Sequence, residues 1–113
     1  MALTVTQLFL PVQLAASAAV IYTMPTSPTT SVLKNGRVRL TNTSGSAVPV
    51  TLYAAPSATA STAANCCLSA VSIAANGYLD VDIPTLTAGD TLRGFAGTAA
   101  VVTIHELGGI VYS

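Results

Sequence analysis

The chain has 113 residues, of which 51% are hydrophobic and only 7% are charged, and its formal net charge is zero. Typical soluble domains carry about 25% charged residues, so Ser, Thr, Asn and Ala must form much of this surface. With only 4 Lys and Arg residues, the chain lacks the dense basic patch that phosphate binding requires, and we expect no nucleic-acid partner. A surface with so little charge is poorly protected against association, and we expect neighbouring subunits to cover part of it.

The stretch from Leu8 to Tyr22 is mostly apolar, but we do not expect it to enter a membrane. It contains Pro11 and Gln13 and is shorter than the ~20 residues that a spanning helix needs. No Lys or Arg precedes it, whereas a secretory signal begins with a positive region. We interpret it as folded sequence.

The first half of the chain alternates short runs of Val, Ile, Leu, Thr and Tyr with Gly, Pro and Asn, which is typical of strands and turns. The Asn35-Gly36 pair predicts either a two-residue hairpin or a bulge in one long strand. Pro11 indicates an edge or a bulge between the first two segments. The predicted strands are Thr4 to Leu10, Val12 to Leu14, Ala19 to Thr23, Ser31 to Thr41 and Val48 to Tyr53.

The second half opens with small residues, Pro56 to Asn65, which predict a surface loop. Asn76-Gly77 and Thr87 to Asp90 are turn signals. The predicted strands are Leu68 to Ile73, Tyr78 to Ile83, Thr91 to Phe95, Ala99 to Leu107 and a short Ile110 to Tyr112.

Roughly eight short strands with turns about every 8–12 residues are typical of a β-sandwich or barrel. We predict an all-β fold, a single antiparallel β-sandwich that is jelly-roll-like or Ig-like. Residues 1–17 are expected to form an N-terminal strand or arm, and residues 18–113 the β-sandwich domain.

Two charged pairs share the spacing i, i+2, which places both side chains of a pair on one face of a strand. Arg37 and Arg39 point one way while Val38 and Leu40 point the other. Asp80 and Asp82 likewise share the outer face of their strand, and Leu79, Val81 and Ile83 are expected to face inward. We hypothesise that the cationic face meets the anionic face, either across neighbouring strands or between subunits. In a chain with so few charges, this pairing would fix register and partner choice.

The remaining polar residues give little support for catalysis or cofactor binding. His105 stands in an apolar strand without the nucleophile motif G-x-S-x-G, so we interpret it as structural and expect no enzymatic activity. Cys66 and Cys67 are adjacent, so we expect two reduced thiols and neither a metal site nor another cofactor. Asn42-Thr43-Ser44 matches a glycosylation sequon, which carries no weight without a secretory signal.

Six segments follow one another in a recognisable order: Ala18 to Pro25, Val38 to Ser44, Val48 to Tyr53, Val71 to Gly77, Leu86 to Leu92 and Ala99 to Glu106. This order resembles that of small tailed-bacteriophage virion proteins. The likeness covers most of the chain from Ala18 onward. The sequence departs from the pattern at Cys66-Cys67 and at Pro49, which lies within a predicted strand.

The resemblance implies a β-sandwich subunit of a phage particle, found in the virion and assembled in the host bacterial cytoplasm. We expect a capsid decoration (cement) protein that binds the major capsid protein or other virion subunits as a homo-oligomer, with a trimer favoured. The alternatives are a neck, collar or tail-fibre component and a host-glycan-binding module. The candidate interface consists of the two charged pairs together with Leu8, Leu10 and Val12, since the segment from Thr4 to Leu14 could dock on a neighbour as an added strand.

Overall fold

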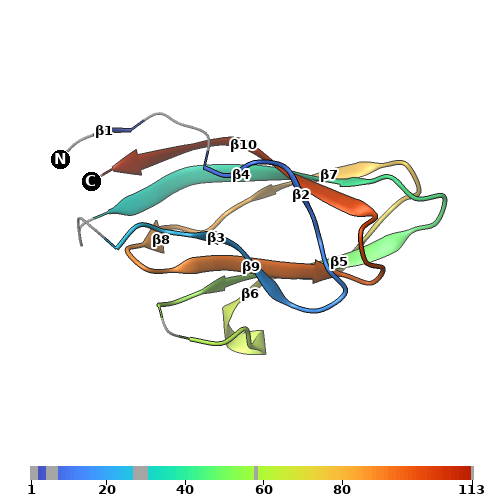
Figure 1. Cartoon of the computed structure of the whole chain (residues 1–113), viewed down its shortest axis with the longest axis horizontal. Helices are drawn as coiled ribbons and strands as arrows, with labels where there is room; N and C mark the ends of the chain where they lie inside the picture. The colour runs from blue at the N-terminus through green and yellow to red at the C-terminus, as the bar shows by residue number, and fades with distance from the viewer. Residues whose placement is uncertain (1–2, 5–7, 27–30, 58, 113) are drawn as a thin grey trace.

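A computed structural model of the chain describes residues 3–4, 8–26, 31–57 and 59–112. Within these residues, ten strands form two antiparallel sheets that pack against each other (Figure 1). The prediction of an antiparallel β-sandwich is therefore confirmed.

The larger sheet, called sheet A here, has the order β1-β10-β4-β7, with β2 also beside β10 and β8 also beside β4. Its strands are β1 (Leu3–Thr4), β2 (Val12–Gln13), β4 (Val32–Asn42), β7 (Tyr78–Asp82), β8 (Leu86–Thr87) and β10 (Val102–Tyr112).

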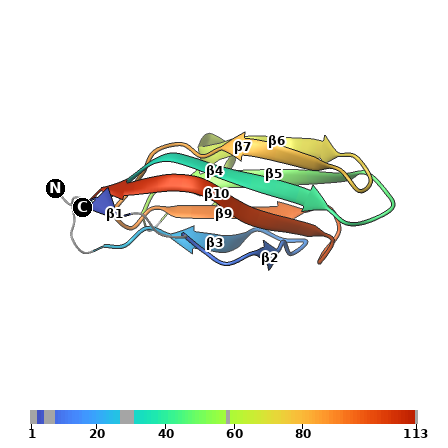
Figure 2. The ribbon, with the colours of Figure 1, turned by 90° about the horizontal axis from the view of Figure 1, so that it is seen from above.

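The smaller sheet, sheet B, has the order β3-β9-β5-β6. Its strands are β3 (Ala19–Thr23), β5 (Val48–Ala55), β6 (Cys66–Ile73) and β9 (Thr91–Ala96). Viewed from above, β6 and β7 lie along one flank of the sandwich and β2 and β3 along the opposite flank (Figure 2).

Alternating apolar residues from both sheets meet between the layers, as the period of two in a strand requires. On sheet A, Leu40 faces inward beside Ile104, and on sheet B, Val50 faces inward beside Ala96. The predicted inward face of β7 is also seen, since Leu79 and Val81 pack against the core. The largest fully buried apolar side chains are Met24, Leu33, Leu40, Leu52, Leu86, Leu92, Ile104, Val38, Val50 and Val102.

Of the two alternatives for Asn35-Gly36, the bulge is correct. β4 runs unbroken through both residues, and Asn35 takes a φ of 56°. Gly36 is buried, and a Cβ there would lie 3.3 Å from Ile83 Cβ. The close approach of β4 to the segment after β7 therefore favours glycine at this position.

The prediction of separate strands for Ala99 to Leu107 and Ile110 to Tyr112 is wrong. A single strand, β10, covers Val102–Tyr112 and pairs with β4 along its length. Gly108 and Gly109 do not form a turn. They lie within β10, and the register of its pairing with β4 shifts on either side of Gly108.

The prediction of one strand over Thr4 to Leu10 is also wrong. Only Leu3–Thr4 forms a strand, residues 5–7 lie outside the described residues, and Leu8 to Leu10 are not extended in a sheet. Leu8 and Phe9 are neighbours in sequence, and both pack against the core. Adjacent residues of a strand point to opposite faces, so this packing excludes regular strand geometry.

The segment after β2 connects the two sheets. Leu14 N donates to Val102 O on sheet A, and Ala96 N on sheet B donates to Ala15 O, each over 2.8 to 2.9 Å. The side chain of Leu14 belongs to the buried core. The predicted arm, residues 1–17, thus includes a core residue, and its two short strands, β1 and β2, pair with the chain's own β10.

Asn42, at the end of β4, is a fully buried polar side chain. Its Nδ2 donates to Ser46 O, Ile73 O and Ala74 O, and its Oδ1 accepts hydrogen bonds from the backbone N and the Oγ of Ser44. This one side chain therefore ties the β4–β5 turn to the end of β6.

The predicted loop from Pro56 to Asn65 contains a short 3-10 helix, η1 (Ala63–Asn65). None of the described helical residues forms a helix long and apolar enough to cross a membrane.

Candidate interaction surfaces

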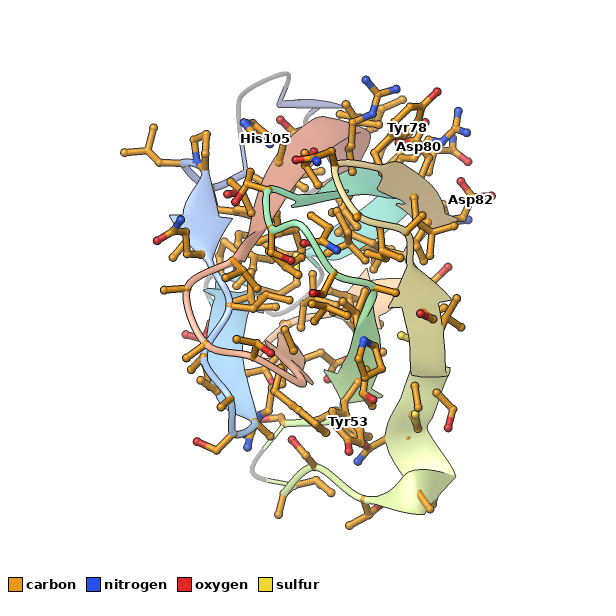
Figure 3. The ribbon with its side chains drawn as sticks, turned by 90° about the vertical axis from the view of Figure 1, so that its right-hand side faces the viewer. Tyr53, Tyr78, Asp80, Asp82 and His105 are labelled. Carbon is orange, nitrogen blue, oxygen red and sulfur yellow. The ribbon has the colours of Figure 1, made fainter. Side chains whose placement is uncertain are left out.

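The two predicted charged pairs meet on the outer face of sheet A. In the β4–β7 register, Arg37 lies opposite Asp82 and Arg39 lies opposite Asp80. Figure 3 shows Tyr78, Asp80 and Asp82 together at one end of the view, with His105 apart from them across the sheet. We call Arg37, Arg39, Asp80 and Asp82 the charged cluster.

The central pair of the cluster has bidentate geometry. Arg39 Nε donates to Asp80 Oδ1 over 2.7 Å, and Arg39 Nη2 donates to Asp80 Oδ2 over 3.0 Å. The Arg39 guanidinium also lies 4.4 Å from the centroid of the Tyr78 ring, a cation–π distance. Two hydrogen bonds to Asp80 and one ring contact with Tyr78 leave the Arg39 guanidinium little rotational freedom.

Hydrogen bonding to Arg39 lowers the pKa of the Asp80 carboxyl, and the positive charges of Arg39 and Arg37 lower it further. Desolvation opposes this shift by favouring the neutral acid. The same hydrogen bond raises the pKa of Arg39. The net effect keeps both groups charged.

The outer pair of the cluster is looser. Arg37 Nε lies 3.7 Å from Asp82 Oδ1, and the side chain of Asp82 is 90% exposed. An open hollow of about 410 Å³ adjoins this pair, lined by Asn35, Pro84 and Thr85 among others. Of the two hypotheses for the charged pairs, the pairing across neighbouring strands is seen, and a contact between subunits is not needed to explain them.

The apolar residues predicted for an interface differ in exposure. Leu8 is partly buried against the core, so most of it already has a partner within the chain. Leu10 is 75% exposed and Val12 is 44% exposed. Val12 lies opposite Ile104 in the pairing of β2 with β10. Leu10 and Val12 are therefore the arm residues that remain open to a neighbour.

Two further exposed apolar residues, Val20 and Val71, were not predicted. Val20 on β3 is 52% exposed and Val71 on β6 is 37% exposed, and these are the outer strands of sheet B. Neither residue belongs to a motif that marks a strand as a sheet edge. Sequence patterns do not indicate which strands are outermost, so no local signal could have singled them out.

Tyr53 on β5 and Phe95 on β9 also form an unpredicted aromatic pair, with ring centroids 6.4 Å apart. Both are half-buried, and Figure 3 places Tyr53 on the opposite side of the sandwich from Asp80 and Asp82. Leu52 and Ala96, the chain neighbours of Tyr53 and Phe95, are buried in the core, so by strand alternation the aromatic pair lies on the outer face of sheet B.

The two cysteines are free and differ in environment. The pairing of β5 with β6 shifts register between Cys66 and Leu68, and Cys67 packs against the core. Burial is the main cause that raises the pKa of the Cys67 thiol, which makes this thiol a poor nucleophile. Cys66 Sγ donates weakly to Leu68 O over 3.4 Å.

His105 is exposed on β10 and lies opposite Arg39 in the β4–β10 register. Within the described part of the chain, His, Cys, Asp and Glu side chains form no group of three or more that could hold a metal ion.

Comparison with known proteins supports the fold. No protein-family model matches the chain, and no curated protein matches it significantly. A solved structure of Bacillus endospore appendages, described as a novel family of disulfide-linked pili, is similar to it. The two share 22% sequence identity and a TM-score of 0.60, over 98% of this chain and 88% of the other. At this identity the likeness shows a shared fold, and the resemblance to phage proteins stays a prediction.

Proposed function

We propose that the chain is a non-catalytic structural subunit of a larger protein assembly. The observation that carries this proposal is the distribution of charge. The chain has 4 basic and 4 acidic residues, and the charged cluster pairs two of each with one another on sheet A. Both outer strands of sheet B lack charge entirely. Charged side chains are a common protection of sheet edges against association, so a surface this poorly protected suits a protein that is covered by neighbours.

The specific form that we propose is a bacteriophage capsid decoration protein, found in the virion and bound to the major capsid protein or to other virion subunits. The segment order that resembles small virion proteins supports this form. Attachment would bury apolar and small side chains at about 25 cal/mol per Å² of apolar area, before ordering costs. A trimer fits the three-fold positions of a capsid lattice.

A subunit of a fibrous appendage is the second candidate. The likeness in fold to a structure described as a pilus of Bacillus endospore appendages favours it. A shared fold does not by itself carry a function across. Both candidates describe a polymerising or attaching subunit, and they differ in the particle that contains it.

Immunogold electron microscopy of the producing cells and their lysate distinguishes the candidates. We expect antibodies against the purified chain to label phage shells, at a copy number comparable with that of the shell protein. Label confined to a phage neck or tail would identify the alternative position in the virion. Label along fibres would support the appendage instead. If the protein is abundant but labels no assembly, the proposed function is wrong.

A further inference from the structure

The two sheets differ in how their edges are protected. One edge of sheet A is occupied by the two-residue strands β1 and β2, and the opposite edge strand, β7, carries Asp80 and Asp82. Very short edge strands and charged side chains both discourage pairing with another chain. The outer strands of sheet B, β3 and β6, contain neither charge nor proline. Sheet B therefore presents two edges that can accept a further strand.

The direction of the strands fits a specific partner. Sheet B has four strands, and every neighbouring pair in it is antiparallel. Its two outer strands, β3 and β6, therefore run in opposite directions. If a second copy is set beside the first in the same orientation, its β6 lies antiparallel to the first copy's β3. The sheet then continues through both copies without a break in its pattern.

The exposed apolar side chains lie on the two flanks that such an arrangement brings together. Six large hydrophobic residues of the described chain are exposed. Three of them, Leu10, Val12 and Val20, belong to the arm and β3, and two others, Val71 and Tyr78, belong to β6 and β7. Figure 2 shows these two sets of elements on opposite sides of the sandwich. One set would pack against the other where two copies meet.

We propose that copies of this chain join head to tail, with β3 of one copy pairing with β6 of the next. The proposal rests on the proposed function and names the partner as a second copy. A single kind of interface then covers both open edges, whereas two-fold pairing would need one interface for β3 and another for β6. Repetition closes into a ring or continues as a filament according to the rotation between copies.

The bulges of both strands limit how much of each edge can pair. β3 shows a register shift between Val20 and Tyr22, and β6 has Ala70 at a φ of 47°. β3 is five residues long, which is ~17 Å of extended strand. So short a ladder does not hold two copies together by itself, and burial of the flank side chains has to contribute. We therefore expect association to depend on concentration.

Lysine substitution of one edge at a time tests the arrangement. Val20→Lys blocks β3 and leaves β6 open, and Val71→Lys does the reverse. Leu107→Lys is the matched control, since Leu107 is 44% exposed and lies on β10 rather than on a flank edge. Each purified variant is checked for an unchanged thermal unfolding transition and then measured by native mass spectrometry and sedimentation velocity.

We expect the wild type and Leu107→Lys to form species of three or more chains. Val20→Lys and Val71→Lys alone should stay monomeric, with association weakened at least ~100-fold because each buries a lysine without a partner. Mixed in equal amounts, the two variants should form a one-to-one heterodimer and nothing larger, since each supplies the edge that the other lacks.

Self-dimers of Val20→Lys or of Val71→Lys would indicate two-fold pairing and would overturn the proposal. Wild-type assembly by both variants, or a wild type that stays monomeric at high concentration, would overturn it as well. None of these results bears on whether antibodies label a particle, so the inference can fail while the proposed function stands.

Discussion

Arg39 on β4 and Asp80 on β7 lie directly opposite each other and form the shortest ion pair of the described residues, with Arg39 Nε 2.7 Å from Asp80 Oδ1. A slip of one residue between these strands would turn the aspartates of β7 toward the apolar core. The pair therefore acts on strand register, because a charged side chain inside the sandwich is far less stable than one on its outer face.

Exchanging the two charges tests this role. Arg39→Asp and Asp80→Arg should each lower the urea midpoint of unfolding, because each places like charges on opposing positions. The double variant should recover part of the loss. Urea unfolding followed by circular dichroism measures all three. The same exchange at Arg37 and Asp82 is the control, and it should have little effect because that pair is looser and more exposed. Equal losses at both pairs would contradict a special role for Arg39 and Asp80.

The lowered pKa of Asp80 predicts a pH dependence of stability. Since the folded state holds this carboxyl below its ordinary pKa of 3.8, the unfolded chain binds its proton first as the pH falls. The contribution of Asp80 is thus complete above the ordinary value and disappears as the pH drops through the lowered folded value. The free energy of unfolding of the wild type should exceed that of Asp80→Asn near neutral pH, and the difference should shrink below about pH 4. A difference that stays constant down to strongly acidic pH would exclude the mechanism.

Asn42→Ala should lower the free energy of unfolding by about 3 kcal/mol, because each buried polar group left without a partner costs about 1–3 kcal/mol. The side chain is fully buried, and its amide satisfies three backbone carbonyls. Urea unfolding of the variant gives the value. Thr43→Ala is the control, since the Thr43 hydroxyl makes one exposed hydrogen bond, to Val101 O, and its loss should cost less than about 1 kcal/mol. Similar losses of unfolding free energy at the two positions would show that the buried hydrogen bonds of Asn42 contribute no more to stability than the exposed one of Thr43.

Gly94→Ala should destabilise the sandwich by about 3 kcal/mol, at the upper end of the usual cost of overpacking. A Cβ at this position would lie 2.5 Å from Leu52 Cδ2 and 2.7 Å from Thr51 O. The carbonyl belongs to the paired strand and cannot move without breaking the ladder. Gly45→Ala is a matched control, since nothing lies within 4 Å of its Cβ position. The comparison is made by thermal unfolding, and a near-neutral Gly94→Ala would mean that β5 and β9 are less closely packed than the structure has them.

The parts of the molecule that were predictable from sequence are those governed by alternation. Along Arg37 to Leu40, side chains of opposite polarity alternate, and this fixed both the inward face and the position of the cations. The same holds for Tyr78 to Ile83, and the two strands turned out to be neighbours. Alternation is a local property of strand geometry, so it can be recognised in the sequence without knowing the partner strand.

The predictions were wrong where contacts with distant parts of the chain determine the local conformation. Gly108-Gly109 has the composition of a turn, but pairing with β4 keeps the chain extended through both residues. Leu8 and Phe9 have the composition of a strand, but both side chains pack against the core instead of alternating between two faces. Val20 and Val71 became candidate interface residues only once β3 and β6 were known to be the outer strands of sheet B. No short segment of the sequence indicates the order of the strands in a sheet.

The buried position of Asn42 has a consequence for producing the protein. Asn42 is the acceptor residue of an Asn-Thr-Ser triplet, and oligosaccharyltransferases of a secretory pathway modify such triplets on extended chains. A glycan on Asn42 has no room in the folded sandwich, because the amide nitrogen that would carry it donates to three carbonyls. Secretion through a eukaryotic host therefore sets glycan transfer in competition with folding, and every modified chain is lost from the folded pool.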